Sequence, residues 1–338
     1  MSTSLLRVAD LRTYFFSFRG QRVVKAVDGV SFSLAAGETL GLVGESGCGK
    51  TTTCSSLFRL LPPGGQIVGG VIEFSGEDLM QKSPAEIQRL RGRDMAMILQ
   101  DPMASLNPLF SIFDQVAEPA YFHRGLRHRP LWERVRHLLE MVRIPSPEQR
   151  MHEYPHQMSG GMRQRIVGAM ALAGEPKLIV ADEPTTNLDV TIQLQYLNLL
   201  KELQRQTGVG LIFVTHNLGI VAKTCDRVAV MYAGKIVEQG SVREIYTHPR
   251  HPYTEGLLKA MPKLGSKASL YAIRGQPPDL AHLPVGCSFA PRCPSVMKRC
   301  TTEEPGDYTV APHHTSRCWL PGHEGEPAPP NRGRQEKC

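Results

Sequence analysis

One eight-residue stretch organises the interpretation of this chain: Gly44-Glu45-Ser46-Gly47-Cys48-Gly49-Lys50-Thr51. It matches the pattern G-x-x-x-x-G-K-[S/T] without a mismatch. A short apolar run, residues 39–43, precedes it, and a helix is expected over residues 52–61. Glycines let successive backbone N–H groups turn inward, and the start of a helix adds partial positive charge. The stretch therefore predicts a phosphate-binding loop (P-loop) that holds a nucleoside triphosphate.

Three side chains of this loop have an expected role. Lys50 is expected to reach the β- and γ-phosphates, and the Thr51 hydroxyl is expected to bind Mg²⁺. Cys48 lies among N–H donors beside Lys50, which predicts that its thiolate form is favoured; an inert small residue is the alternative. The expected nucleotide site consists of Gly44, Glu45, Ser46, Gly47, Cys48, Gly49, Lys50, Thr51 and Thr52.

Composition narrows the class of protein. The 338 residues are 41% hydrophobic and 21% charged, which is typical of a soluble protein with a proper core. The net charge of +7 is spread along the chain without a Lys/Arg tract, so we expect a solvated surface rather than a nucleic-acid partner. No run approaches the roughly 18 apolar residues of a membrane span, and the N-terminus meets charge too early for a signal peptide. We therefore expect a cytosolic chain that touches a membrane only through partners.

Short apolar runs and helical segments alternate along the chain. Strands are expected at 71–74, 95–99, 178–181 and 211–214, after two β-rich segments at 8–18 and 23–34. Residues 101–176 have a helical texture, and a further helix is expected at 191–206. One apolar helix face combines Leu131, Val135, Leu138, Leu139 and Val142. This pattern predicts an α/β domain with a mainly parallel sheet, a helical insertion, and the nucleotide at the carboxyl ends of the strands.

Two adjacent acids follow one of the expected strands. Asp182 ends the apolar run, where P-loop ATPases place a second carboxylate for Mg²⁺. Glu183 can face the γ-phosphate and polarise a water as a general base. Further on, Ser159-Gly160-Gly161 combines a serine with bare backbone at the expected start of a helix, which is a ready anion site.

These motifs occur in a fixed order that resembles an ABC transporter ATPase over roughly residues 8–262. Gln100 corresponds to the Q-loop and His216 to the H-loop of that family. The resemblance is closest to the ATP-binding subunit of oligopeptide and dipeptide importers, and to the first of its two paired subunits. The residues that carry it are Gly44–Lys50, Gln100–Pro108, Ser159–Arg165, Asp182–Thr186, Leu188-Asp189, Thr215-His216, Met231–Gly234 and His251–Thr254.

The resemblance implies roles that the residues alone do not. Gln100 would sense Mg²⁺ and the attacking water, Glu183 would be the catalytic base, and His216 would contact the γ-phosphate. Phe15 would stack on adenine, with Tyr14 the next candidate; a core position is the alternative for this aromatic side chain. The signature residues Ser159, Gly160, Gly161 and Gln164 would reach the ATP of a facing subunit, and Asp189 would belong to the D-loop.

The resemblance also implies an assembly. Two ATP molecules would lie between two such domains, usually two different ATPase subunits. Two membrane-spanning permease subunits and an extracytoplasmic solute-binding protein would complete an importer for peptides at the cytoplasmic face of the membrane. A permease helix is expected to dock near residues 101–119. Nickel complexes or sugars are alternative solutes within the same branch.

The implied fold is a P-loop NTPase of the ABC type with an antiparallel β subdomain and a helical subdomain at about 101–176, together residues 1–262. A cysteine-rich extension would follow at 263–321, and 322–338 would be a disordered tail. The extension carries Cys287, Cys293, Cys300 and Cys318. Their loose spacing suits a [4Fe-4S] cluster better than Zn²⁺, and the resemblance implies the same cluster; free thiols are the third possibility.

Two other functions compete with transport. A soluble ABC ATPase of DNA repair would carry a long coiled coil between Gln100 and Asp182, and this interval is too short for one. A translation-type ATPase would carry two nucleotide domains, and only one P-loop pattern is present. In the second competing function, the cysteine segment is the main functional unit and acts as a redox sensor that gates the ATPase.

Overall fold

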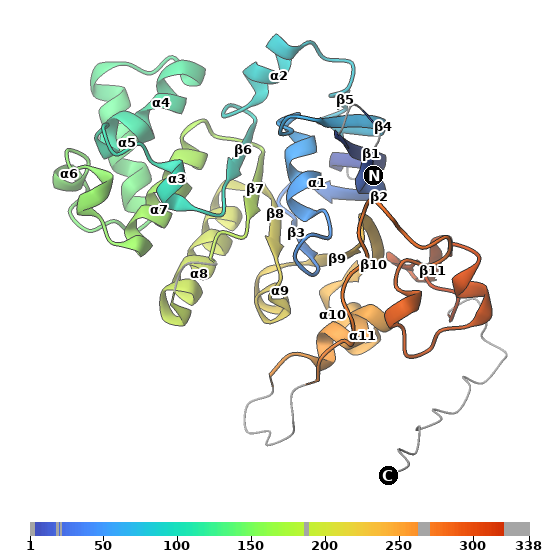
Figure 1. The fold of residues 1–338 in the computed structure, drawn as a ribbon. Coiled ribbons are helices and arrows are strands. Elements are labelled where there is room, and N and C mark those ends of the chain that lie inside the picture. The colour runs from blue at the N-terminus through green and yellow to red at the C-terminus, as the bar shows by residue number, and fades with distance from the viewer. Residues whose placement is uncertain (1–3, 18–19, 21, 186–188, 263–270, 321–338) are drawn as a thin grey trace.

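The computed structural model describes residues 4–17, 20, 22–185, 189–262 and 271–320. Two sheets form the centre of the molecule, and the helical part and the C-terminal extension lie on opposite sides of them (Figure 1). The expected tail at 322–338 lies outside the described residues. Within the described part, no helix has both the length and the apolar character that a membrane span requires.

The larger sheet has eight strands in the order β11-β12-β10-β9-β3-β8-β7-β6. Its parallel strands are β3 (Thr39–Val43), β6 (Met95–Ile98), β7 (Leu178–Asp182), β8 (Gly210–Thr215) and β9 (Arg227–Tyr232). Every residue of β3, β7 and β8 is buried, because helices and the second sheet cover both faces. The expected mainly parallel sheet is confirmed.

The smaller sheet has the order β2-β1-β4-β5 and is antiparallel. Its strands are β1 (Ser4–Ser17), β2 (Arg22–Ala35), β4 (Gly65–Phe74) and β5 (Glu77–Asp78). The helix α1 (Lys50–Leu57) lies between the two sheets, and its Cys54 and Leu57 join one core with residues of β1, β2 and β3. This helix is earlier and shorter than the expected 52–61, since Arg59 turns the chain at φ +51°.

The helical part lies between β6 and β7. Leu131, Val135, Leu138, Leu139 and Val142 are all buried, as their spacing predicts. Helix α2 (Pro84–Leu90) precedes β6. The helices of the helical part are α3 (Pro102–Ser105), α4 (Ile112–Arg124), α5 (His128–Met141), α6 (Pro147–Arg150), the 3₁₀ turn η2 (Pro155–Gln157) and α7 (Gly160–Ala173). After β7 follow α8 (Val190–Thr207), α9 (Leu218–Thr224), α10 (Val242–Thr247) and α11 (Pro252–Lys259).

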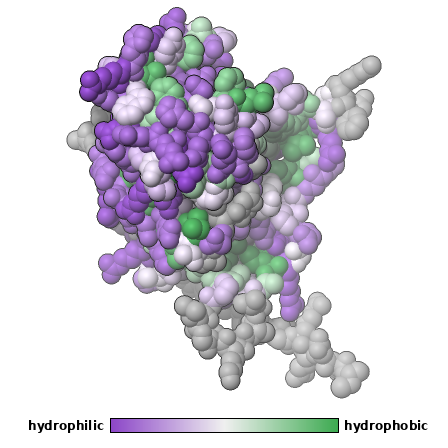
Figure 2. Space-filling view, turned by 90° about the vertical axis from the view of Figure 1, so that its left-hand side faces the viewer, coloured by the Kyte–Doolittle hydropathy of each residue, from purple (hydrophilic) through white to green (hydrophobic). Residues whose placement is uncertain are grey.

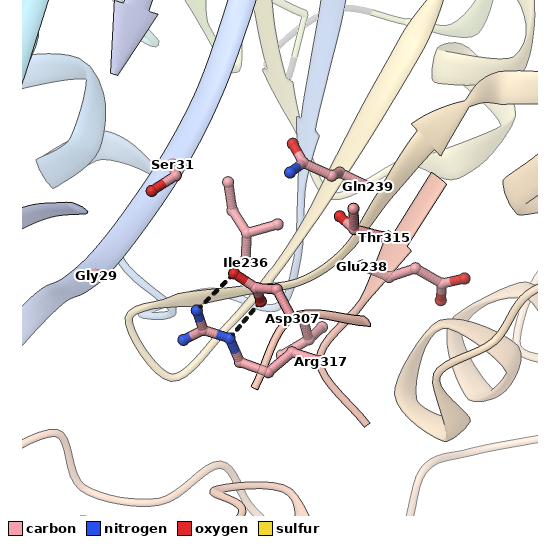
Figure 3. A pocket seen from close by; sticks show the side chains of 9 residues that line it. Gly29, Ser31, Ile236, Glu238, Gln239, Asp307, Thr315 and Arg317 are labelled. Atoms are coloured by element: carbon pink, nitrogen blue, oxygen red, sulfur yellow. Dashed lines mark hydrogen bonds and ion pairs between the residues drawn. The ribbon is translucent and has the colours of Figure 1, made fainter. Parts of the chain in front are cut away.

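The cysteine-rich extension is attached to the larger sheet. It contains two 3₁₀ turns, η3 (Ala290–Arg292) and η4 (Lys298–Thr301), and a hairpin of β11 (Tyr308–Ala311) and β12 (His314–Ser316). Strand β12 pairs antiparallel with β10 (Lys235–Ser241), so the hairpin continues the sheet. Figure 3 shows Arg317 at this junction, where its guanidinium donates to the Asp307 carboxylate at 2.8 and 3.0 Å.

Candidate nucleotide site

The phosphate-binding loop connects β3 to α1. Its backbone needs glycine at two crowded points. Gly49 has φ +106°, and a Cβ there would lie 2.1 Å from the Ala26 carbonyl oxygen. A Cβ on Gly44 would lie 2.2 Å from the Met231 carbonyl oxygen. A larger residue at either position would force the backbone apart, so these glycines are required by the fold of the loop.

Lys50 is buried at 5% exposure, although its side chain is charged. Its Nζ donates to the carbonyl oxygens of Gly44 at 2.9 Å and Glu45 at 3.0 Å. The ammonium group is therefore held by the loop itself. It lies in the P-loop, as the sequence predicts, at the position from which phosphate oxygens can replace carbonyls as acceptors.

Asp182 lies at the end of β7 beside the start of α1. Its carboxylate is 4% exposed and accepts a hydrogen bond from Thr51, while its Oδ1 has no hydrogen-bond partner among the described residues. Burial, and next the Glu183 charge, raise the pKa of Asp182, although Thr51 and Lys50 act against this. A buried, unsatisfied carboxylate oxygen next to a hydroxyl fits a hard cation such as Mg²⁺.

Three residues from the ends of neighbouring strands meet at Glu183. Gln100 follows β6 and its Nε2 lies 3.5 Å from Glu183 Oε2; His216 follows β8 and its Nδ1 lies 3.4 Å from the same oxygen. Glu183 has φ +45°, a rare conformation for a side-chain-bearing residue, and its N–H donates to the Val214 carbonyl at 3.0 Å. The structure thus brings together the three side chains to which the sequence assigns catalysis.

The signature segment begins a different helix. Ser159 caps α7, and its Oγ accepts from the Met162 N–H at 3.3 Å. Ser159 and Gly160 are exposed, and nothing lies within 4 Å of a Cβ built on Gly160. Gln164, by contrast, is buried at 1% exposure, so its side chain faces the interior of this chain and not the exposed surface at the start of α7.

Asp189 lies just before α8 and caps it. Its Oδ1 accepts from the N–H groups of Thr191 at 3.1 Å and Ile192 at 3.0 Å. The side chain is therefore exposed and oriented by the helix start, while the neighbouring residues 186–188 lie outside the described part of the chain.

The two aromatic candidates for adenine stacking differ in their contacts. The Tyr14 hydroxyl donates to Asp28 Oδ1 at 2.6 Å, and burial together with this bond raises the pKa of Tyr14 to about 12. Phe15 lies against the backbone of β4, since a Cβ on Gly65 would lie 2.8 Å from its Cε1. Tyr14 is already engaged by a carboxylate, so Phe15 remains the better candidate, and its stacking on adenine stays a prediction.

The expectation of a favoured Cys48 thiolate is wrong. Cys48 is 5% exposed, and this burial raises the pKa of its thiol more than the nearby Lys50 charge lowers it. The sequence shows the cation and the helix start, but it does not show how completely the sulfur is removed from water. Burial disfavours the charged form of a thiol, so Cys48 fills space under the loop.

The cysteines of the extension gather around one small cavity of about 10 Å³, which the buried His251 also lines. Burial raises the pKa of Cys293 to about 11 and of Cys318 to about 12. The four cysteines that line the cavity are Cys287, Cys293, Cys300 and Cys318. Across the described residues, no three His, Cys, Asp or Glu side chains are arranged to hold a metal ion. The structure therefore does not support the expected metal-binding extension, although the thiols are neighbours.

Sequence reasoning missed two residues that contact the P-loop from far along the chain. Arg292 of the extension donates to the Glu45 carboxylate at 2.7 and 3.0 Å, and the Tyr253 hydroxyl accepts from the Glu45 N–H at 3.0 Å. Neither lies near the loop in sequence. Tyr253 belongs to the stretch His251–Thr254 that carries the resemblance, but the sequence assigns it no role in the site. For Arg292, the available sequence signal is that it directly precedes Cys293, one of the four cysteines of the extension.

The helical part carries an apolar groove of about 540 Å³ next to the segment that follows Gln100. Among its lining residues are Phe110, Phe113, Tyr121, Phe122 and Leu131. Phe122 is 70% exposed, which is unusual for so large an apolar side chain. Figure 2 faces this side of the molecule, and there apolar patches interrupt a mostly hydrophilic surface.

Comparisons with known proteins agree with this geometry. The family model described as ABC transporter matches residues 27–186, and the one described as oligopeptide/dipeptide transporter, C-terminal region, matches residues 237–300. The dipeptide transport ATP-binding protein DppD of Bacillus subtilis (strain 168) is 48% identical over 326 residues, covering 96% of this chain and 97% of that protein. The oligopeptide transport ATP-binding protein OppD of the same organism is 49% identical over 321 residues, covering 94% and 89%.

Solved structures share the fold. CbiO1 from Clostridium perfringens, described as part of an ABC transporter complex, has a TM-score of 0.63 and 27% identity, covering 72% of this chain and 91% of that chain. The ATP-binding cassette MJ0796 bound to ADP and Pi has a TM-score of 0.63 and 24% identity, covering 70% and 99%.

Proposed function

Because this chain belongs to the ABC transporter family and is an ABC-type ATPase, we propose that it drives uptake of di- or oligopeptides through a membrane importer. The observation that carries the proposal is the meeting of Gln100, Glu183 and His216 near the P-loop, where Lys50 and Asp182 are both buried. The peptide as solute is supported by the names of the relatives DppD and OppD and by the matching C-terminal region. A nickel complex or a sugar remains the alternative cargo.

ATP would lie along the P-loop with its phosphates over the start of α1. Apart from the N–H groups of Glu45 and Cys48, which donate within the chain, the backbone from Gly44 to Thr52 would offer N–H donors, and Lys50 would exchange loop carbonyls for phosphate oxygens. Thr51, Asp182 and Gln100 would hold Mg²⁺, which supplies charge neutralisation of the phosphates when bound. These residues fit Mg²⁺ because the buried Asp182 Oδ1 has no hydrogen-bond partner among the described residues.

Hydrolysis requires a water aligned with the γ-phosphate. Glu183 is positioned to accept its proton, because Gln100 and His216 both approach the same carboxylate oxygen and orient it. His216 is largely exposed at 60%, so its other ring nitrogen is free to approach a γ-phosphate. Phe15 would support the adenine ring from β1.

The site is completed by a second ATPase subunit. The start of α7 presents Ser159 and Gly160 to solvent, with bare backbone and the positive end of a helix dipole. Such a surface suits the phosphates of a neighbour's ATP, with Gly161 and Asp189 beside it. Gln164 is left out of this contact because it is buried. A different, paired subunit is the expected neighbour.

The remaining partners are two permease subunits and an extracytoplasmic solute-binding protein, with this chain at the cytoplasmic face of the membrane. The groove lined by Phe110, Phe113 and Phe122 supports the permease contact, since an amphipathic helix buries its apolar face in such a groove. The groove adjoins the segment after Gln100, so helix docking there can reach the catalytic side chains.

A [4Fe-4S] cluster, or Zn²⁺ as the alternative, is proposed for the extension on the basis of its four neighbouring thiols. All-thiolate ligation suits the cluster chemically. The cavity that these thiols line measures about 10 Å³, which holds about one water. Iron, sulfide and zinc analysis of anaerobically purified protein tests this; absence of all three leaves free thiols.

The test of the function uses the complete importer in proteoliposomes. ATP hydrolysis is expected to rise when a peptide-loaded binding protein is added, and Glu183→Gln is expected to lower it by at least about a hundredfold while ATP still binds. Uptake of labelled dipeptide, oligopeptide, nickel complex and sugar separates the cargoes. A rate of ATP hydrolysis that no loaded binding protein changes would contradict the transport role.

A further inference from the structure

Arg292 of the C-terminal extension is almost fully engaged by the nucleotide domain. Its Nη1 donates to Glu45 Oε2 at 2.7 Å and its Nη2 donates to Glu45 Oε1 at 3.0 Å. Its Nε donates to the Arg274 carbonyl at 3.0 Å, and Nη1 also donates to the Tyr232 hydroxyl at 3.3 Å. The Arg292 side chain is only 5% exposed, against 27% for Glu45. All three guanidinium nitrogens are used, which holds the group in one orientation.

A second contact holds the backbone of the same P-loop residue. The Glu45 N–H donates to the hydroxyl of Tyr253, which is fully buried. The Tyr253 ring packs against Tyr232 and Phe289, with centroids 4.6 and 5.4 Å apart. Residues from α11, β9 and the extension therefore build one support under Glu45.

The position of Glu45 matters for the charge of the loop. A carboxylate inside a phosphate-binding loop repels a polyanionic nucleotide unless a cation compensates it. Arg292 supplies that cation, and its rigid fork matches the carboxylate in a way that a lysine cannot. The Glu45 carbonyl also accepts from Lys50 Nζ at 3.0 Å, so a shift of Glu45 would move the lysine that meets the phosphates.

We propose that Arg292 is a positioning residue of the ATPase. It neutralises and orients Glu45, and through Glu45 it keeps the phosphate-binding loop and Lys50 in the geometry that receives ATP. The C-terminal extension thereby supports nucleotide binding in its own chain. This role depends on the ion pair and not on what the four cysteines bind.

The test measures ATP hydrolysis by the assembled transporter as a function of ATP concentration. Arg292→Ala is expected to raise the KM for ATP on the order of tenfold with a smaller change in kcat, because a charged hydrogen-bonded pair is lost from the binding loop. Arg292→Lys keeps the charge without the fork and is expected to be intermediate. Lys298→Ala removes an exposed positive charge from the same extension and is expected to leave the KM unchanged.

A double variant that also removes the Glu45 charge distinguishes this positioning role from a general loss of stability. Adding Glu45→Gln to Arg292→Ala removes the uncompensated carboxylate and is expected to recover most of the KM. The proposal is overturned if Arg292→Ala keeps the wild-type KM, or if the double variant is no better than the single one. Should Arg292→Ala not fold, Arg292→Lys decides: a wild-type KM overturns the proposal, and a severalfold rise that Glu45→Gln reverses supports it.

Discussion

His314 of the extension and Glu238 of β10 form a buried hydrogen-bonded pair, with His314 Nε2 2.8 Å from Glu238 Oε1 and side-chain exposures of 3% and 0%. The same carboxylate accepts from the N–H groups of Arg250 at 2.6 Å and His251 at 3.0 Å. Glu238 therefore connects three segments: the sheet, the approach to α11, and the C-terminal hairpin.

Removing one partner of this pair is expected to loosen the extension. His314→Ala leaves the Glu238 carboxylate buried without its side-chain partner, which costs about 1–3 kcal/mol in the free energy of unfolding for a lost hydrogen bond to a buried charged group. Urea denaturation measures the loss, and limited proteolysis of residues 271–320 locates it. His313→Asn, an exposed neighbour whose φ of +61° an asparagine tolerates, is the matched control. Equal stability of the two variants would contradict the connection.

Gly160→Asp is expected to lower ATP hydrolysis without lowering the stability of the fold. Nothing lies within 4 Å of a Cβ at this position, and an acid near the start of α7 is favourable for the helix itself. The unfolding temperature should therefore stay within a few degrees of wild type, while the carboxylate repels the phosphates of a facing ATP.

The measurement is ATP hydrolysis by the assembled transporter, expected to fall at least about tenfold, because a repulsion of about 1.4 kcal/mol already changes a rate by that factor. ATP binding to the P-loop of the isolated chain serves as the control. Hydrolysis at the wild-type rate by the Gly160→Asp transporter would remove the proposed contact between subunits.

Alkylation of Cys48 is expected to be slow in the folded protein. The thiol is buried and its pKa is raised, so both access and thiolate content are lower than for free glutathione. Mass spectrometry after iodoacetamide treatment at pH 8 reports the modified fraction, with urea-unfolded protein as the reference. Cys48→Ser is expected to retain hydrolysis. Rapid modification of the native chain would restore the rejected thiolate interpretation.

Asp28 is expected to stabilise the fold in a pH-dependent manner. Burial alone would raise the pKa of its carboxyl, but the Tyr14 hydrogen bond and the Lys235 charge lower it below the ordinary value of 3.8. The folded state thus binds fewer protons than the unfolded state at acidic pH. Stability from this group is present above about pH 4 and is lost as the pH falls through the lowered value.

Comparison with Asp28→Asn makes this measurable. At pH 7 the wild type is expected to be more stable in urea by about 1 kcal/mol, as for a hydrogen bond to a charged group that is partly exposed to solvent. The difference should shrink on acidification below about pH 4, where the unfolded carboxyl is protonated. A difference that stays constant down to the acid transition would show that the hydrogen bond acts without its charge.

The sequence by itself determined the catalytic half of this protein. The P-loop is contiguous, and its glycines, Lys50 and Thr51 specify one local backbone shape. Asp182, Glu183 and His216 follow buried strands, and neighbouring parallel strands bring their carboxyl ends to one edge, so their meeting could be predicted. Local propensity and strand order carry that information.

Only the tertiary structure decided the rest. Whether Cys48 is exposed, whether Gln164 faces outward, and which side chain supports Glu45 all depend on packing between segments far apart in the chain. Arg292 lies 247 positions from Glu45, and no periodicity links the two. Burial and long-range pairing depend on how whole elements dock, which spacing along one segment does not encode.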